Sequence, residues 1–131
     1  MATPDFTTAR GQVRLLISDV SSDEARQILS DDMVDGLLAR WTVEPDAGVT
    51  PRGPIGRAAA DALDAIATSE ALVSKVIRTG DGVTTDGAKL ADALRKQAAT
   101  LRAQADKDDI DEAADEDSFF GVAEFHPYPS R

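Results

Sequence analysis

Two long segments with a helical apolar pattern, joined by a glycine-rich junction, constrain the fold of this chain more than any other feature. In the first segment, residues 55–79, apolar side chains recur at steps of three and four, which is the period of one helix face. The second segment repeats this spacing with Leu90, Leu94, Ala98 and Leu101. Each segment therefore presents an apolar stripe that the other can cover. We expect a long helical hairpin at the centre of the fold.

The junction between the two segments contains two Asp-Gly pairs. Glycine accepts positive φ and aspartate bonds its own local backbone, so the first helix is expected to stop here. The flanking β-branched residues suit a short β-hairpin around Asp81 and Gly82, and a plain loop is the alternative. Thr85 or Asp86 can cap the second helix. The residues expected at the projecting tip are Gly80, Asp81, Gly82, Val83, Thr84 and Asp86.

The residues before the hairpin predict two short helices. Thr7 or Thr8 can cap a helix that runs to about Ile17. Ser30 can cap a second, amphipathic helix that carries acidic residues in its first turn, where the helix dipole favours them. Its last apolar residue, Trp41, is expected to fill the core. The stretch between these helices is expected to form a loop.

A crossing rich in proline and glycine, residues 42–54, connects the second short helix to the hairpin. Arg52 and Arg57 flank its end. They could bind an anion at the start of the long helix, where unpaired backbone N–H groups point outward. We expect a solvated turn instead.

Length and composition point to one small soluble domain made in the cytoplasm. The chain has 131 residues, which suffices for a single core. It contains no cysteine, so a disulfide framework and a cysteine-based zinc site are excluded. Its N-terminus lacks the features of a secretory signal, and no run is long enough to cross a membrane. The net charge is −10, and an acidic chain without a basic stripe is a poor ligand for nucleic acid.

Most of the negative charge lies in residues 106–117, which hold eight acids and one lysine for a net charge of −7. The spacing invites comparison with a calcium-binding loop. The stretch lacks the required glycine at its sixth position, has Ile110 at a ligand position, and ends in Asp117 instead of glutamate. We therefore expect a self-repelling, solvated acidic linker. This places a helical domain in residues 1–105, before the linker.

The remaining residues, 118–131, contain three of the four phenylalanines and the only tyrosine. Disordered tails are usually poor in aromatic residues, and the prolines favour an extended segment that docks onto a partner or onto its own domain. We favour a neighbouring chain, because the acidic stretch separates this segment from the body of the protein. The candidate contact residues are Phe119, Phe120, Val122, Phe125, Pro127, Tyr128 and Pro129.

No pattern in the chain indicates catalysis. The single histidine, His126, stands beside a proline in the tail, without cysteines and without the held partner that a general base needs. A phosphate-binding loop, a nucleophile elbow and a zinc-binding HExxH motif are all missing. We predict a protein that is not an enzyme and uses no cofactor or metal. The predicted fold is mainly α, a small helical bundle built on the hairpin, with an extended C-terminal tail.

Six stretches follow one another along the chain in a recognisable order and spacing: VRLLISD (13–19), LSDDMVDGLL (29–38), AAADALDAIA (58–67), KVIRTGDGVTTD (75–86), ADALR (91–95) and LRA (101–103). Together they resemble the head-to-tail connector or adaptor proteins of long-tailed bacteriophages. The resemblance covers most of residues 10–105, and its most specific part is the helix, Gly-Asp and helix junction. The crossing at residues 42–54 departs from the family pattern by its length and its prolines.

The resemblance implies a structural virion protein at the head-to-tail neck, made in the host cytoplasm. Such subunits form a homo-oligomeric ring, usually of twelve copies, beneath the portal protein. The ring extends the DNA channel, lets DNA pass without specific binding, and offers a platform to tail-completion, stopper or tail proteins. In a ring, the tip at residues 80–86 would contact a neighbouring subunit. The alternative function is a small acidic interaction or regulatory module whose acidic segment occupies a basic groove on its partner.

Overall fold

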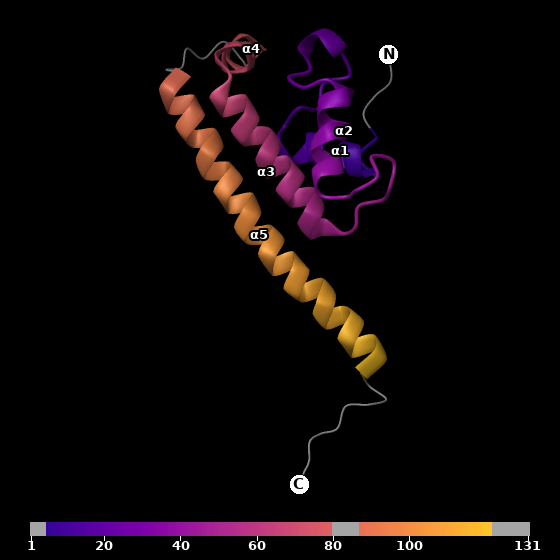
Figure 1. The fold of residues 1–131 in the computed structure, drawn as a ribbon. Helices are drawn as coiled ribbons and strands as arrows, with labels where there is room; N and C mark the ends of the chain where they lie inside the picture. Colours follow the sequence, from indigo (N-terminus) through magenta and orange to yellow (C-terminus); the bar gives the residue numbers. More distant parts are fainter. Residues whose placement is uncertain (1–4, 80–86, 122–131) are drawn as a thin grey trace.

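The structure, a computed structural model, describes residues 5–79 and 87–121. These residues are mainly helical and form no strand, as the sequence predicts for the class of the fold. The expected β-hairpin and the caps at Thr85 and Asp86 lie outside the described residues. The helices, shown in Figure 1, are α1 (Ala9–Leu16), a short 3₁₀ turn (Glu24–Arg26), α2 (Asp31–Arg40), α3 (Arg52–Thr68), α4 (Glu70–Thr79) and α5 (Gly87–Gly121).

The predicted helical hairpin is the antiparallel pair α3 and α5 (Figure 1). Small residues let the two backbones approach closely: a Cβ on Gly56 would lie 3.5 Å from the Cβ of Ala105. The residues of α5 that face α3 are spaced alternately three and four positions apart, which is the repeat of coiled-coil packing. They include Ala91, Leu94, Ala98, Leu101 and Ala105, of which the alanines are buried and the leucines partly buried.

Helices α1 and α2 cover the other side of α3. Their buried side chains Val13, Val34 and Leu38 join Leu63 of α3 in one core. Both predicted caps are present. The Thr8 hydroxyl accepts a hydrogen bond from the backbone N–H of Gly11 at 3.1 Å, and the Ser30 hydroxyl accepts one from Met33 at 3.2 Å. Since α3 packs against helices on both sides, most of its residues are buried.

The prediction of one continuous helix over residues 55–79 is wrong. Ser69 has an extended backbone, with φ −105° and ψ 114°, and separates α3 from α4. Its hydroxyl accepts a hydrogen bond from the N–H of Leu72 at 3.3 Å, so Ser69 caps the next helix instead of continuing the last one. In Figure 1, α4 turns away from the axis of α3 and is seen nearly end-on. This turn lets Leu72 and Val76 pack back onto the core.

The boundary expected at Ala105 is not visible in the backbone. Helix α5 runs without interruption through the acidic residues 106–117, predicted as a solvated linker, and ends at Gly121. It therefore includes residues 118–121 of the segment predicted to be extended. Its C-terminal part extends beyond the other helices (Figure 1). The acids tolerate a helix because several of them pair with arginines of α3.

Candidate interaction site

Arg57 of α3 holds the acidic half of α5 against the body of the protein. Its Nη2 atom donates to Asp106 at 2.7 Å and to Asp109 at 2.6 Å. The two carboxylates lie one helical turn apart and thus on the same face of α5. Hydrogen bonds to Asp109 and then to Asp106 raise the pKa of the Arg57 guanidinium above its usual value. The guanidinium also lies 5.8 Å from the ring centroid of Trp41, within the range of a cation–π contact.

The start of α3 makes the next contact along α5. Glu112 accepts a hydrogen bond from Nε of Arg52 at 3.2 Å and approaches the backbone N–H of the same residue at 3.3 Å. A carboxylate at this position satisfies an unpaired N–H and interacts favourably with the helix dipole. Hydrogen bonding to Glu112 raises the pKa of Arg52. The anion at this helix start is therefore supplied by the chain itself.

A third arginine links α5 back to the middle of α3. Arg102 donates to Asp61 at 2.9 Å and to Asp64 at 2.6 Å, which raises its pKa, with Asp64 as the larger cause. The indole N–H of Trp41 donates to the other oxygen of Asp61 at 2.9 Å. Trp41 packs partly buried against the core, as predicted, but its polar edge also joins the ion-pair network.

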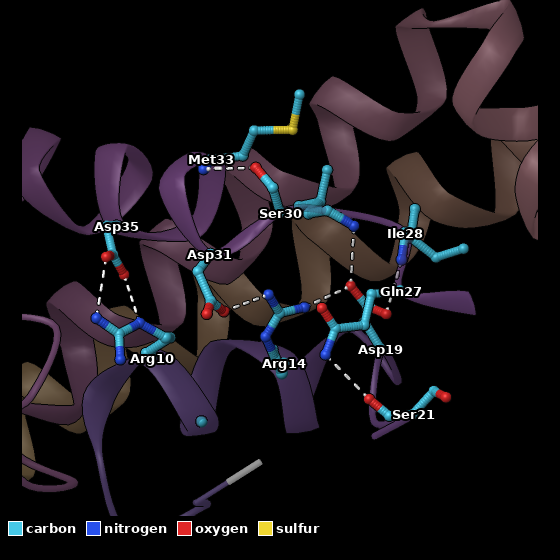
Figure 2. A network of polar contacts seen from close by, with 12 residues as sticks. Arg10, Arg14, Asp19, Ser21, Gln27, Ile28, Ser30, Asp31, Met33 and Asp35 are labelled. Carbon is cyan, nitrogen blue, oxygen red and sulfur yellow. Dashed lines mark hydrogen bonds and ion pairs between the residues drawn. The ribbon is translucent and has the colours of Figure 1, made fainter. Parts of the chain in front are cut away.

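The loop between α1 and α2 is held by a separate network (Figure 2). Arg14, only 2% exposed, donates to Asp19 at 2.9 Å and to Asp31 at 2.7 Å. The Asp19 carboxylate also accepts hydrogen bonds from the backbone N–H groups of Ile28 and Leu29 at 2.9 and 3.0 Å. A buried carboxylate with three donors fixes a loop that has little regular structure of its own.

In the same region, Arg10 binds both carboxylate oxygens of Asp35, at 2.7 and 2.9 Å (Figure 2). It also approaches Asp46 at 3.2 Å, in the crossing between α2 and α3. Its pKa is raised, chiefly by the hydrogen bonds to Asp35. These contacts join α1, α2 and the proline-rich crossing into one body.

A small apolar groove lies where α1, the crossing, α3 and α5 meet. Its volume is about 130 Å³, far below the 300 Å³ or more of a typical small-molecule site. Apolar and polar side chains both line it, and most of its exposed lining is apolar. The lining residues are Gln12, Leu16, Val49, Arg52, Ile55, Gly56, Leu101, Gln104, Ala105 and Asp108.

The outer face of α5, which points away from α3, is exposed. Most of its residues are alanine or charged, and Ile110 stands out as a large apolar side chain that is 69% exposed. Lys107 and Asp111 flank it and are also exposed. This face has no covering element in the part of the chain that the structure describes.

The contact residues predicted from the sequence are not placed. Gly80, Asp81, Gly82, Val83, Thr84 and Asp86 lie outside the described residues, as do Val122, Phe125, Pro127, Tyr128 and Pro129. Phe119 and Phe120 belong to the described backbone of α5 only.

The sequence did not predict the ion pairs of Arg52 and Arg57 with the acids of α5, which we call the clamp. The spacing of Asp106, Asp109 and Glu112 by steps of three signals one helix face and could have revealed it.

Within the described residues, no group of histidine or acidic side chains comes together as a metal site would require. None of the helices described there combines the length and apolar character needed to cross a membrane. No protein-family model, no curated protein and no solved structure matches this chain.

Proposed function

We propose that this protein is a structural virion protein of a long-tailed bacteriophage, a head-to-tail adaptor. Copies of it form a ring of about twelve subunits beneath the portal, extend the DNA channel, and join the capsid to tail-completion, stopper or tail proteins. The ring belongs to the neck of the virion and is assembled in the host cytoplasm. The sequence resemblance at residues 13–103 motivates this proposal.

One structural observation carries the proposal: the core is closed around α3, yet the outer face of α5 remains exposed over residues 88–114 of a helix about 52 Å long. Helices α1 and α2 cover one side of α3, and α5 covers the other. The fold is therefore complete in one subunit and still presents a long surface to a neighbour. Head-to-tail repetition of such a contact closes into a ring when the rotation permits.

The charge of the chain suits a channel for DNA. Its net charge is −10, and the acids Asp92, Asp106, Asp109 and Asp111 of α5 are exposed. Proteins that retain DNA do so with cationic contacts to phosphate. An acidic lumen repels the phosphates and lets DNA slide without specific binding.

The pairing of the acids speaks against the alternative, an acidic module that occupies a basic groove on a partner. Asp106, Asp109 and Glu112 already bind Arg57 and Arg52 of the same chain. A partner would have to displace these internal contacts. The same segment also carries Asp115, Glu116 and Asp117, so replacing these three by asparagine, glutamine and asparagine tests the alternative. The adaptor keeps its ring under this change, whereas an acidic module loses its partner.

The C-terminal segment, residues 118–131, allows a test of how the subunit attaches to the portal. We propose that Phe119, Phe120, Val122, Phe125, Pro127, Tyr128 and Pro129 contact the portal or a neighbouring subunit, and that the tip at residues 80–86 contacts the adjacent copy. Deleting residues 118–131 should abolish cosedimentation with the portal protein encoded by the same phage, while circular dichroism stays helical. Unchanged portal binding and ring assembly by the truncated protein would remove this role of the tail.

A further inference from the structure

The small groove and the exposed Ile110 lie on opposite sides of α5. At about 100° per residue, Ile110 points roughly 180° away from Leu101 and 200° away from Asp108, which both line the groove. One subunit thus carries an apolar projection on one side and an apolar recess on the other. This arrangement can repeat from copy to copy, because each subunit can offer its projection to one neighbour and its recess to the next.

The size of the groove fits one side chain. Its volume is about 130 Å³ and its apolar lining includes Leu16, Ile55 and Leu101. A dry apolar cavity of about 150 Å³ holds one benzene molecule, so this groove accepts one aliphatic side chain and is too small for a drug-sized ligand. Val49, 44% exposed, stands at its rim.

The charges around the two surfaces are complementary. Lys107 and Asp111 flank Ile110, one turn apart on the exposed face of α5. Arg52, whose side chain is 50% exposed, and Asp108 flank the groove. Arg52 is already paired with Glu112 of its own chain at 3.2 Å, and Asp106, one turn before Ile110, is bound by Arg57. The complementary charges that remain are Lys107 beside Ile110 and Asp108 beside the groove, so Lys107 can face Asp108 of the next copy.

An exposed isoleucine alone is ordinary on a protein surface. Ile110, however, sits in the most acidic part of the chain, where a polar residue would suit an outer helix face better. We propose that Ile110 of one copy seats in the groove of the next copy, and that this contact joins neighbouring subunits. The inference rests on the proposed function, because it names the contact through which the ring would close.

The absence of cysteine from the chain allows a direct test by disulfide trapping. We would prepare Ile110→Cys and Val49→Cys, mix them, and oxidise the mixture both alone and bound to the portal protein. A disulfide forms when the two Cα atoms come within about 4.4–6.8 Å. The mixture should give a covalent dimer on a non-reducing gel, and a chain with both substitutions should give a ladder of multimers. Ile110→Cys mixed with Met33→Cys, an exposed residue of α2 outside both surfaces, is the matched control and should stay monomeric.

The competing outcomes are each distinct. Dimers of Ile110→Cys with itself would show two α5 faces packed together, and trapping of Val49→Cys by Tyr128→Cys would show the tail in the groove. Either result overturns the proposal. Complete absence of trapping also overturns it. Images of the same samples report rings independently, so rings without trapping reject only this contact, whereas trapping without rings rejects the adaptor function.

A second variant checks the energetics without cysteine chemistry. Ile110→Asp should weaken self-association about ten- to hundredfold in sedimentation equilibrium, as expected for loss of one buried aliphatic side chain. Because Ile110 is exposed in the subunit, the circular dichroism and the melting temperature of the Ile110→Asp protein should equal those of the natural chain. Met33→Asp serves as control. Equal self-association of the two variants would contradict the proposal.

Discussion

The carboxylate of Asp109 occupies the space into which a side chain on Gly53 would project. A Cβ built on Gly53 would collide with Oδ1 of Asp109, the acid that binds Arg57 at 2.6 Å. The glycine at the start of α3 therefore lets the acidic half of α5 approach closely. It makes room for the clamp between the two helices.

This relationship predicts that Gly53→Ala has different effects in two backgrounds. Alanine is favoured over glycine in a helix by about 1 kcal/mol, but here the Asp109 carboxylate must leave Arg57 to make room. We expect the gain in unfolding free energy to be smaller by about 0.5–1 kcal/mol in the natural chain than in an Asp109→Ala background, measured by urea unfolding. Gly36→Ala in α2, where a Cβ meets open space, is the control and should stabilise both backgrounds equally. Identical gains from Gly53→Ala in both backgrounds would disprove the coupling.

The helices could be predicted from the sequence because their signals are local. Apolar spacing and caps placed α1, α2 and the hairpin correctly, with Thr8 and Ser30 as the capping residues. The break at Ser69 could not be predicted, since the apolar pattern continues across it. There the tertiary gain of packing Leu72 against the core outweighs the continuity of one helix.

The prediction of a solvated linker for residues 106–117 was wrong because its outcome depends on contacts with residues far away in the sequence. The charge of this segment predicts self-repulsion, and only the fold reveals that Arg52 and Arg57, which precede their acidic partners by 49 to 60 residues, lie beside it. A pairing across that separation depends on the register of α3 against α5. The clamp was thus visible in the sequence only as a spacing of acids, and its partners were not.

Arg57 should control the order of the acidic half of α5. In Arg57→Ala, Asp106 and Asp109 lose their shared cation, so hydrogen–deuterium exchange in residues 106–114 should speed up about three- to tenfold while the core of α3 stays protected. Raising the salt concentration to about 1 M should have a similar effect on the natural chain, because salt screens exposed ion pairs. Lys107→Ala is the control in the same stretch. Exchange rates that do not differ between the two variants would show that the clamp contributes nothing to this order.

Asp19 should be important for stability. Asp19→Ala leaves the Arg14 guanidinium, 2% exposed, without its buried partner, and it removes the acceptor for two backbone N–H groups. Breaking a buried ion pair in this way costs about 3–5 kcal/mol of unfolding free energy. Asp111→Ala, at an exposed position, should change it by no more than about 0.5 kcal/mol. Thermal and urea unfolding measure both, and similar values for the two variants would contradict the role of Asp19.

The close approach of α3 and α5 makes Ala105 sensitive to size. Ala105 is 1% exposed and faces Gly56, so Ala105→Leu should destabilise the protein by about 1–3 kcal/mol through overpacking. Ala103→Leu, on the exposed side of the same helix, should have little effect. Differential scanning calorimetry compares the two. An equally stable Ala105→Leu would mean that the helices do not pack in this register.

The most direct test of the adaptor function is an electron-microscopic reconstruction of the protein bound to the portal protein of the same phage. We predict a closed ring of about twelve copies coaxial with the portal, with α5 of each copy against its neighbour and an open channel along the axis. A complex with single, separate copies, or with the acidic residues of α5 inserted into a basic groove of the partner, would contradict the account.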